Sequence, residues 1–264
     1  MMMFASDLDR TLIYSERALS EFKEHSNSDL VGVERRDGLE VAFMTKDAFE
    51  SLRELAENIL FVPVTTRTYE QFQRIFMFSE DIPLTYAVTS NGANIIYNGK
   101  PLTEWREFVQ KRLEKECTSL EAMIQKIKGF EIKGKLKKAE SLFFYYILDE
   151  IISLETGKLI RVLAEANGWR VSIQGRKLYL VPKPVCKGEA VKFIKEREGI
   201  HTVFGAGDSL LDHDFLKVCE YPFVPLHGEL ANEKGINYLI SQRRGIKAGE
   251  EILFEITDIL KKTV

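Results

Sequence analysis

The chain has 264 residues, of which 45% are hydrophobic and 29% are charged, and its formal net charge is −3. This length allows one large domain or two of ordinary size, and the apolar fraction is sufficient for a globular core. The slightly negative charge excludes the broad basic field typical of nucleic-acid-binding proteins, so we expect no nucleic-acid partner.

Cysteine usage and apolar runs indicate the cellular context. Cys117, Cys186 and Cys219 are widely separated and lack metal-ligand spacing, which favours reduced thiols in a cytoplasmic protein. Residues 1–5 lack a basic region and a long apolar region, so we interpret them as a strand and not as a signal peptide. No apolar run is long enough to span a bilayer, and we expect no membrane partner. The sequence does not indicate an oligomeric state.

An acidic motif follows this first apolar run. Asp7-Leu8-Asp9-Arg10-Thr11 places two carboxylates at i and i+2, which point to the same side of an extended segment. If the strand ends near Asp7, both carboxylates face one pocket, where oxygen ligands suit Mg²⁺. One carboxylate can then attack an electrophile while the other moves a proton. The alternative is a plain helix cap, since Asp and Thr often follow a strand for that reason.

Strands and helices alternate from this motif to about residue 100. A hairpin is predicted over 30–45, because Asp37-Gly38 separates two strand-like runs. Helical and apolar patterns then predict a helix, a strand, a helix and a strand over 46–59, 60–64, 69–78 and 86–89. This alternation favours an α/β core with a Rossmann-like parallel sheet.

Thr65 and Arg67 directly follow the predicted strand over 60–64. A hydroxyl and backbone N–H groups at a strand-to-helix turn suit a phosphate, so Thr65 is a candidate phosphate ligand. Arg67 is a candidate substrate contact. The alternative for Thr65 is a simple helix N-cap.

The pattern changes between Pro101 and Pro182. The predicted order is helix, strand, helix, strand, strand, over 103–128, 141–148, 154–167, 169–173 and 177–181. This order is typical of an α+β unit with helices on one face of a sheet. We therefore interpret 101–182 as a cap domain inserted into a discontinuous core formed by 1–100 and 183–264. Pro182-Lys183-Pro184 marks the return, because prolines end a strand and stiffen a linker.

A second acidic cluster follows the strand predicted over 201–206. Gly207 permits a sharp turn, and Asp208 and Asp212 then stand at i and i+4 on one face of a turn or starting helix. Open α/β sheets bind ligands beyond the carboxyl ends of their strands, where both acidic clusters would lie. The alternative is a glycine turn before a helix cap. The remaining core elements are predicted over 187–198, 211–219, 221–224 and 248–262.

In order, Asp7-Leu8-Asp9-Arg10-Thr11, Thr65, Lys187 and Gly207-Asp208-x-x-x-Asp212 resemble the four motifs of the haloacid dehalogenase (HAD) phosphohydrolase superfamily. The long segment between Thr65 and Lys187 is similar to the branch that carries its cap there. This branch includes the Cof-type sugar phosphatases and sucrose-phosphate phosphatase. Thr89-Ser90-Asn91-Gly92-Ala93 resembles the turn before that cap. Thr66 and Leu211 depart from the family, which often has Gly and Asn at these positions.

The resemblance implies a Mg²⁺-dependent phosphomonoesterase that hydrolyses a small phosphorylated metabolite, such as a sugar phosphate, through an aspartyl-phosphate. It implies that Asp7 is the nucleophile and that Asp9 is the general acid and base. The implied metal ligands are Asp7, Asp9 (through its carbonyl), Asp208 and Asp212, and the implied phosphate ligands are Thr65 and Lys187. The alternative for Lys187 is a solvated lysine. Two other functions stay open, a phosphomutase and a non-catalytic HAD-like binding module.

Further candidates for substrate contacts are Asn91, Arg170, Arg176 and His227. The two cap arginines suit an anionic or sugar-like substrate, although a solvated cap surface explains them equally well. His227 follows the last core strand and can overhang the pocket, whereas most lone loop histidines are structural. The hairpin over 30–45 occupies the place where the superfamily carries a mobile flap.

Overall fold

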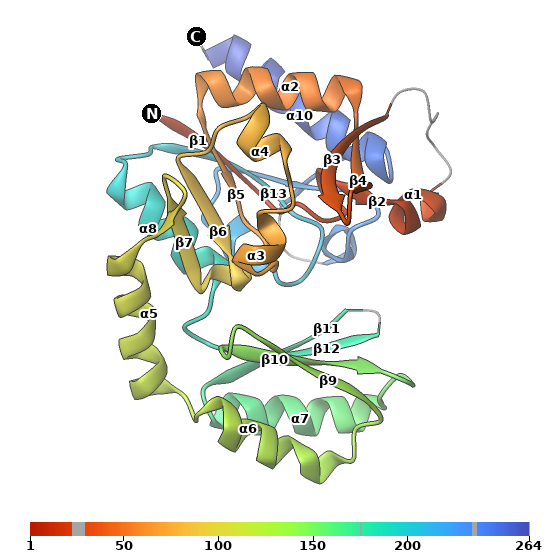
Figure 1. Ribbon diagram of the computed structural model, residues 1–264, viewed down its shortest axis with the longest axis vertical. Helices are drawn as coiled ribbons and strands as arrows, with labels where there is room; N and C mark the ends of the chain where they lie inside the picture. Colours follow the sequence, from red (N-terminus) through yellow and green to blue (C-terminus); the bar gives the residue numbers. More distant parts are fainter. Residues whose placement is uncertain (23–29, 175, 234–236, 264) are drawn as a thin grey trace. The chain divides into compact units, whose positions relative to one another are not determined.

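The computed structural model describes residues 1–264 except 23–29, 175, 234–236 and 264. The chain divides into two compact units, which are described separately (Figure 1). Unit 1 comprises Met1–Pro101 and Lys187–Val264, and unit 2 comprises Leu102–Cys186. The interpretation of 101–182 as a substrate-selecting cap stays a prediction.

The centre of unit 1 is a parallel sheet of five strands in the order β15-β14-β13-β1-β5. Ser6 of β1 is in register with Ala206 of β13 on one side and with Pro63 of β5 on the other. The three strands therefore end at the same edge of the sheet. This arrangement confirms the predicted α/β class with a parallel sheet. The strands are β1 (Met2–Ser6), β5 (Leu60–Pro63), β13 (Thr202–Ala206), β14 (Tyr221–Val224) and β15 (Leu239–Ile240).

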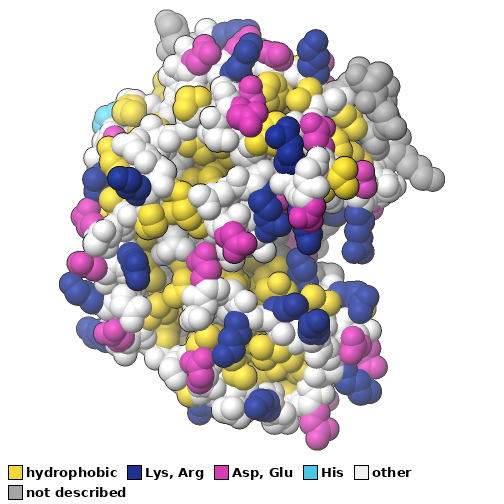
Figure 2. All heavy atoms as spheres, in the orientation of Figure 1, with side chains coloured by type: hydrophobic (Ala, Val, Ile, Leu, Met, Phe, Trp, Pro, Cys, Tyr) yellow, Lys and Arg dark blue, Asp and Glu magenta, His cyan; other side chains and the backbone are white. Residues whose placement is uncertain are grey.

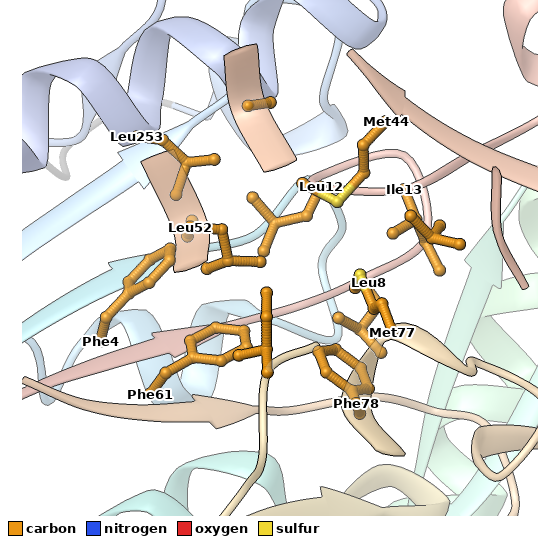
Figure 3. Close-up of a cluster of buried hydrophobic side chains, with 14 of the residues drawn as sticks. Phe4, Leu8, Leu12, Ile13, Met44, Leu52, Phe61, Met77, Phe78 and Leu253 are labelled. Atoms are coloured by element: carbon orange, nitrogen blue, oxygen red, sulfur yellow. The ribbon is translucent and has the colours of Figure 1, made fainter. Parts of the chain in front are cut away.

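One face of this sheet carries the main apolar core. Phe4 and Phe204 are paired on that face, and both are buried against α2 (Lys46–Asn58) and α10 (Ile246–Thr263) (Figure 1). Figure 3 shows these layers interlocking through Phe4, Phe61, Leu52, Leu253, Leu12, Met44, Leu8, Ile13, Met77 and Phe78. Burial of this apolar surface holds the strand ends in place under the acidic motifs.

The opposite face is covered by α9 (His213–Leu216), which packs beside α8 (Lys187–Arg197). Gly205 permits this close approach, because a Cβ atom there would lie 2.5 Å from the sulfur of Cys219 and 3.0 Å from Leu216. The helix predicted over 211–219 is shorter in the structure, where α9 spans His213–Leu216. The chain preceding α9 forms a turn in which the Asp212 N–H donates to the Ser209 carbonyl.

The predicted hairpin is confirmed as β3 (Leu30–Arg36) and β4 (Leu39–Thr45), which form a sheet with β2 (Tyr14–Ser15) in the order β2-β4-β3. Asp37 and Gly38 both have positive φ, 52° and 80°, as the tight hairpin turn requires. Val33, Ala42 and Met44 belong to the main apolar core, so the inner side chains of the hairpin pack against the rest of unit 1.

A small antiparallel sheet, β6-β7-β8, extends the parallel sheet through a bridge between Val64 and Val88. Its strands are β6 (Tyr86–Thr89), β7 (Asn94–Tyr97) and β8 (Lys100–Pro101). The turn between β6 and β7 contains Ser90 and Asn91, with φ of 52° and 58°. Asn tolerates this left-handed region better than most residues, which explains its place in the turn.

The segment predicted as one helix over 69–78 is two short helices, α3 (Tyr69–Phe72) and α4 (Met77–Glu80). The Arg74 carbonyl between them accepts a hydrogen bond from the Arg35 N–H of β3 at 3.0 Å. A contact with the hairpin thus takes the place of a helical hydrogen bond, and the single-helix prediction was wrong.

Unit 2 contains an antiparallel sheet in the order β11-β12-β10-β9, with α6 and α7 on one face (Figure 1). The strand over 134–139 was not predicted. The helix predicted over 103–128 is divided by Thr118 and Ser119. Thr118 binds Asn167 through its N–H and its hydroxyl, and Ser119 caps α6. The elements are α5 (Thr103–Glu116), α6 (Leu120–Ile127), β9 (Gly134–Ala139), β10 (Phe143–Leu148), α7 (Leu154–Ala166), β11 (Trp169–Gln174) and β12 (Lys177–Pro182).

The surface carries both signs of charge. Lys and Arg side chains alternate with Asp and Glu over the face shown in Figure 2, with apolar side chains between them. Among the described residues, every helix is too short or too polar to span a bilayer.

Candidate active site

The carboxyl ends of three parallel strands bring distant motifs together. The Asp7 N–H donates to the Ala206 carbonyl at 2.8 Å, and the Val64 N–H donates to the Ser6 carbonyl at 2.7 Å. The sheet pairing therefore continues one residue beyond the strands and places the residues that follow side by side. Asp7, Thr65 and Asp208 are at this edge because each lies within two residues of the end of its strand.

Three carboxylates gather at this edge. Asp7, Asp208 and Asp212 each offer an oxygen within 4.8 Å of the others. Asp7 is 6% exposed and Asp212 is fully buried. The side chain of Asp9, by contrast, is half exposed and binds elsewhere. The structure therefore joins three of the four predicted acidic side chains, and Asp9 stands apart from them.

Burial shifts the ionisation of this cluster. It raises the pKa of Asp7 to about 7, with Asp212 and Asp9 adding repulsion and Lys187 opposing the rise. Burial, with repulsion from Asp7 and Asp212, also raises the pKa of Asp208 well above its usual value. A site with more carboxylates than cations fits a hard divalent cation with oxygen ligands, which would supply the missing positive charge.

Lys187 is the cation at the centre of the cluster. Its Nζ donates to Asp7 Oδ1 at 2.7 Å and to Asp212 Oδ1 at 2.6 Å, and its side chain is 1% exposed. Burial lowers the pKa of Lys187, but the charges of Asp212 and Asp7 outweigh this and raise it above the usual value. The alternative of a solvated lysine is therefore wrong. Lys187 holds the predicted nucleophile, and its contact with phosphate stays a prediction.

Asp212 has both carboxylate oxygens engaged. Oδ1 accepts from Lys187, and Oδ2 accepts from the Ser209 N–H at 3.0 Å and from the Ser209 hydroxyl at 2.9 Å. Asp212 thus fixes both the lysine and the turn after β13. The sequence contains no distinctive signal for Ser209, which lies between the two predicted aspartates.

Thr65 is not a helix N-cap, because the N-cap of α3 is Thr68, which forms a capping box with Gln71. The Thr65 hydroxyl accepts from the Arg67 N–H at 3.1 Å. Since this contact uses the oxygen as an acceptor, the hydroxyl keeps its own hydrogen for donation. That property suits the predicted contact with a phosphoryl oxygen.

Asn91 is joined to Thr65 through the backbone, because its N–H donates to the Thr65 carbonyl at 3.0 Å. The side chain is 2% exposed, and its Oδ1 atom is buried without a hydrogen-bond partner among the described residues. A buried amide oxygen without a partner is costly, so a donor from a ligand would stabilise it. The predicted substrate contact of Asn91 stays a prediction.

Arg67 is held by protein carboxylates. Its Nε and Nη2 atoms donate to the two oxygens of Asp9, each at 2.8 Å, and its Nη1 lies 2.9 Å from Glu34 Oε2. The guanidinium joins Asp9 to the hairpin, and the predicted substrate contact of Arg67 stays a prediction. No motif in the sequence marks Glu34, which is one of 40 acidic residues.

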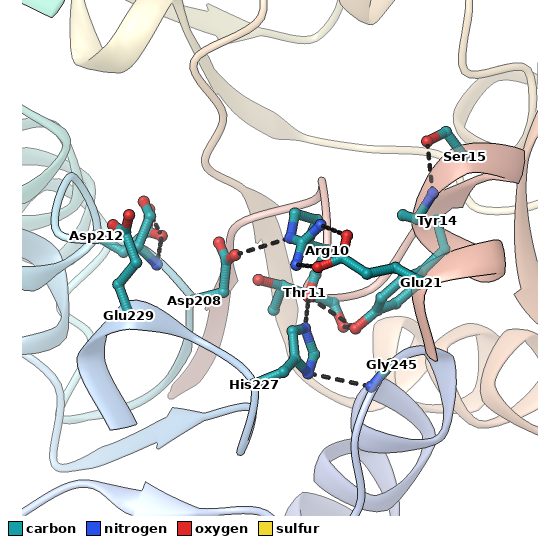
Figure 4. A network of polar contacts seen from close by, with 12 residues as sticks. Arg10, Thr11, Tyr14, Ser15, Glu21, Asp208, Asp212, His227, Glu229 and Gly245 are labelled. Carbon is teal, nitrogen blue, oxygen red and sulfur yellow. Dashed lines mark hydrogen bonds and ion pairs between the residues drawn. The ribbon is translucent and has the colours of Figure 1, made fainter. Parts of the chain in front are cut away.

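Arg10 forms a second polar network beside the carboxylates (Figure 4). It has a left-handed backbone, with φ of 65°. Its guanidinium binds Glu21 of α1 (Glu16–Phe22) at 2.8 Å and lies 3.7 Å from Asp208. Its carbonyl accepts from the Tyr14 hydroxyl at 2.7 Å. This network holds the chain after the first acidic motif against α1.

His227 is part of the same network (Figure 4). Its Nδ1 accepts from the Gly245 N–H at 3.1 Å, so its Nε2 donates to the Arg10 carbonyl at 2.9 Å. Burial is the main cause that lowers its pKa to about 4, and the ring is neutral. Both ring nitrogens are engaged by the backbone, which supports the structural alternative, and the predicted substrate contact of His227 stays a prediction.

The two arginines predicted to bind substrate lie in unit 2. Arg170 Nη2 donates to the Val185 carbonyl at 2.8 Å, and Arg176 Nε donates to the Leu148 carbonyl at 2.8 Å. Arg170 projects from β11 on the same side as Ser172. Ser172 is paired with Tyr179 of β12, and Tyr179 is paired with Tyr145 of β10. The rings of Tyr145 and Tyr179 are 5.2 Å apart. This row lies on the sheet face opposite α6 and α7.

Comparisons of the sequence with family models and of the structure with solved structures both find sucrose-phosphate phosphatases. The sucrose-6F-phosphate phosphohydrolase family matches residues 42–224, more than half of the chain. Comparison with curated protein sequences finds no match. The sucrose-phosphatase from Synechocystis sp. PCC6803, solved in complex with sucrose and phosphate, is similar in structure, with a TM-score of 0.72, 15% identity and 97% of each chain covered.

Two further solved structures are similar. The protein 0175 of Thermoplasma acidophilum has a TM-score of 0.62 and 15% identity, over 98% of this chain and 97% of that one. A haloacid dehalogenase-like hydrolase of Bacillus subtilis has a TM-score of 0.56 and 16% identity, over 98% and 90% of the two chains. At these identities the structural likeness shows a shared fold.

Proposed function

The chain belongs to the sucrose-6F-phosphate phosphohydrolase family and is a HAD-type phosphatase, and we propose that it hydrolyses a sugar phosphate with the aid of Mg²⁺. The family match confirms the resemblance drawn from the four motifs. The single observation that carries the proposed chemistry is the buried contact of Lys187 with Asp7, inside a cluster of three carboxylates at the end of β1.

In the first proposed step, a carboxylate oxygen of Asp7 attacks phosphorus. The new bond joins that oxygen to phosphorus, and the bond between phosphorus and the sugar oxygen breaks. Lys187 holds Asp7 in place at 2.7 Å, so the nucleophile is oriented before substrate binds. The Thr65 hydroxyl donates to a phosphoryl oxygen and stabilises the charge of the transition state.

Asp9 supplies and then removes a proton. Its half-exposed carboxyl group protonates the departing sugar oxygen, and the resulting carboxylate takes a proton from the water that attacks the aspartyl-phosphate. Cleavage of the phosphorus–Asp7 bond releases phosphate, restores the Asp7 carboxylate and leaves Asp9 protonated for the next cycle. The different surroundings of Asp7 and Asp9 suit these different roles.

Asp7, Asp208 and Asp212 would hold the Mg²⁺ ion, together with the Asp9 carbonyl. When bound, the ion supplies positive charge to the phosphoryl group and to the carboxylates around it. Asp212 already binds Lys187 and Ser209, so we expect it to contribute mainly by orienting its neighbours. The raised pKa values of Asp7 and Asp208 support the need for a cation.

Sucrose 6F-phosphate is the first candidate substrate, because it is the substrate named for the family. In unit 2, Tyr145 and Tyr179 form an aromatic pair, and Lys177 Nζ lies 6.0 Å from the centroid of the Tyr145 ring. Aromatic and basic side chains on one sheet face provide stacking surfaces and hydrogen-bond donors for a polar ligand. We propose that this face, with Arg170, recognises the sugar.

Phosphate release from a panel of sugar phosphates, with and without Mg²⁺, tests the proposal. We expect Mg²⁺-dependent hydrolysis of sucrose 6F-phosphate or a related sugar phosphate, loss of activity with EDTA, and recovery with Mg²⁺ but less with Ca²⁺, which prefers more ligands at longer distance. Undiminished hydrolysis in chelator would contradict the metal assignment. Failure to hydrolyse any member of the panel would contradict the proposed substrate class.

A further inference from the structure

We propose that Glu34, on the hairpin β3–β4, is a positioning residue that orients the general acid Asp9 through Arg67. This inference rests on the proposed role of Asp9 and adds a residue that no sequence motif marks. It assigns the hairpin a part in proton transfer, in addition to its packing role.

The contact between Arg67 and Asp9 fixes the plane of the carboxylate. Two parallel hydrogen bonds of 2.8 Å join Nε and Nη2 of Arg67 to the two oxygens of Asp9. Such a forked pair sets orientation as well as distance. The Asp9 side chain is half exposed, so without Arg67 it would be free to adopt other rotamers.

Glu34 in turn holds Arg67. The Glu34 side chain is 8% exposed and that of Arg67 is 14% exposed, and Glu34 Oε2 lies 2.9 Å from Nη1 of Arg67. All three guanidinium nitrogens therefore contact protein carboxylates. Burial lowers the pKa of Arg67, but its hydrogen bonds with Asp9 and the charges of Asp9 and Glu34 raise it above the usual value, so the arginine stays charged.

A bulge in β3 directs Glu34 inward. The pairing of β3 with β4 shifts between Gly32 and Glu34 and again between Glu34 and Arg35. In a regular strand neighbouring side chains face opposite sides, yet Val33 and Glu34 are both buried. Bulges often redirect a side chain in this way beside active sites.

The hairpin is anchored next to Glu34. The Arg35 N–H donates to the Arg74 carbonyl at 3.0 Å, and the Arg35 guanidinium lies 4.4 Å from the centroid of the Phe76 ring. Val33 is fully buried in the main apolar core. Glu34 therefore has a fixed backbone from which to hold Arg67, and through it Asp9.

Two aryl esters separate this role from a general loss of structure. p-Nitrophenolate leaves as a stable anion, whereas phenolate depends more on a proton from the general acid. The ratio of kcat/KM for p-nitrophenyl phosphate to kcat/KM for phenyl phosphate therefore reports the action of Asp9. Both esters lack a sugar, so the ratio is independent of the proposed sugar specificity.

We expect Glu34→Ala to lower kcat/KM for phenyl phosphate about tenfold more than for p-nitrophenyl phosphate. Glu34→Gln should restore most of the difference, because its amide oxygen can still accept from Arg67. Arg67→Ala should show a larger difference, and adding Glu34→Ala to it should change the ratio no further, since coupled residues are not additive. Glu40→Ala, an exposed acid on β4 of the same hairpin, is the matched control and should leave the ratio unchanged.

Equal losses on both esters, or additive effects in the double variant, would overturn the positioning role of Glu34 while leaving phosphatase activity established. If Asp9→Asn left the ratio of the two kcat/KM values unchanged from that of the wild type, the role of Asp9 would be overturned, and with it this inference. Wild-type protein that releases phosphate from neither ester would instead count against the proposed phosphatase chemistry itself.

Discussion

Asp7 and Asp9 are two residues apart in the chain, but their surroundings differ. Asp7 is buried among Asp208, Asp212 and Lys187, whereas Asp9 is half exposed and held by Arg67. The buried carboxylate is oriented by a lysine and shifted in pKa by its neighbours. The exposed one is accessible to water. A single short motif thus supplies two different carboxylates, because the fold gives each its own environment.

The largest expected effect is on Asp7. Asp7→Asn keeps the shape of the side chain but removes the nucleophilic charge, so kcat should fall about 10³-fold or more. Phosphate release measures the loss, and circular dichroism checks that the fold is intact. A variant with more than about a tenth of wild-type turnover would show that another group attacks phosphorus.

The second comparison is between the two cations that hold these carboxylates. Lys187→Met leaves Asp7 and Asp212 unpaired in a buried site, and we expect the free energy of unfolding to fall by about 3 kcal/mol. Arg67→Met removes a more exposed pair with Asp9 but also leaves Glu34 buried without its cation, so we expect a smaller loss of about 2 kcal/mol. Urea unfolding of both variants makes the comparison. Lys192→Met is the control on α8, since Lys192 is 58% exposed, and it should change stability little.

Similar losses in the Lys187 and Arg67 variants would indicate that the two sites are equally sheltered from water. The contrast between a buried and an exposed carboxylate would then be wrong. Mg²⁺ should recover part of the stability of the Lys187 variant, because it supplies another positive charge to the same carboxylates.

Asp9→Asn should affect catalysis more than folding. Loss of a general acid and base typically costs about 100-fold or more, so kcat/KM for phenyl phosphate should fall by at least that factor. The loss on p-nitrophenyl phosphate should be smaller, since its leaving group needs less protonation. Stability should change by less than about 1 kcal/mol, because the side chain is half exposed. Equal losses on the two esters would argue against proton donation by Asp9.

The smallest expected effect is on the pH dependence of stability. The pKa of Asp7 is raised from 3.8 to about 7 in the folded protein. Between these values the folded state binds a proton that the unfolded state has released, so the stability of metal-free protein should fall as pH rises. Mg²⁺ should therefore raise Tm more at about pH 8 than at about pH 5, with a difference of roughly 3 °C.

Differential scanning calorimetry at both pH values, with EDTA or Mg²⁺, measures this effect. Asp7→Asn should reduce the pH dependence without abolishing it, because the amide does not titrate whereas Asp208, whose pKa is also raised, still does. Asp9→Asn is the matched control and should keep it. If the metal-free wild-type protein became more stable with rising pH relative to the Asp7→Asn variant, the raised pKa of Asp7 would be contradicted.

Local patterns predicted most of the elements near the acidic edge. The strands around Phe4, Phe61 and Phe204 are short apolar runs, which indicate buried strands directly. The Asp37-Gly38 turn requires residues that accept positive φ, and the sequence has them. Two predicted helices are interrupted where a residue distant in the chain takes part in the hydrogen bonding. The Arg35 N–H donates to the Arg74 carbonyl within 69–78, and the Thr118 N–H within 103–128 donates to the Asn167 carbonyl.

The candidate site shows the same contrast between features that local sequence patterns indicate and features that only the folded structure reveals. The motifs indicated Asp7, Asp208 and Asp212, which the structure brings together at the sheet edge, and their catalytic and metal-binding roles stay a prediction. They did not indicate Glu34 or Ser209, because neither has a characteristic spacing. Glu34 acts through a contact with Arg67, which is distant in the chain, and depends on a bulge in β3. Ser209 acts within the turn before α9, where it binds Asp212 three residues away. No single-residue preference specifies the bulge or the turn.

The sequence by itself determined the α/β class and the order of its acidic motifs, because short apolar strands followed by Asp residues have a meaning independent of the rest of the chain. Only the tertiary structure decided how those carboxylates differ. Lys187 reaches Asp7 from a distance of 180 residues, and Arg67 reaches Asp9 from 58 residues. Burial, ion pairing and orientation depend on such neighbours, which the sheet and the hairpin bring together in space.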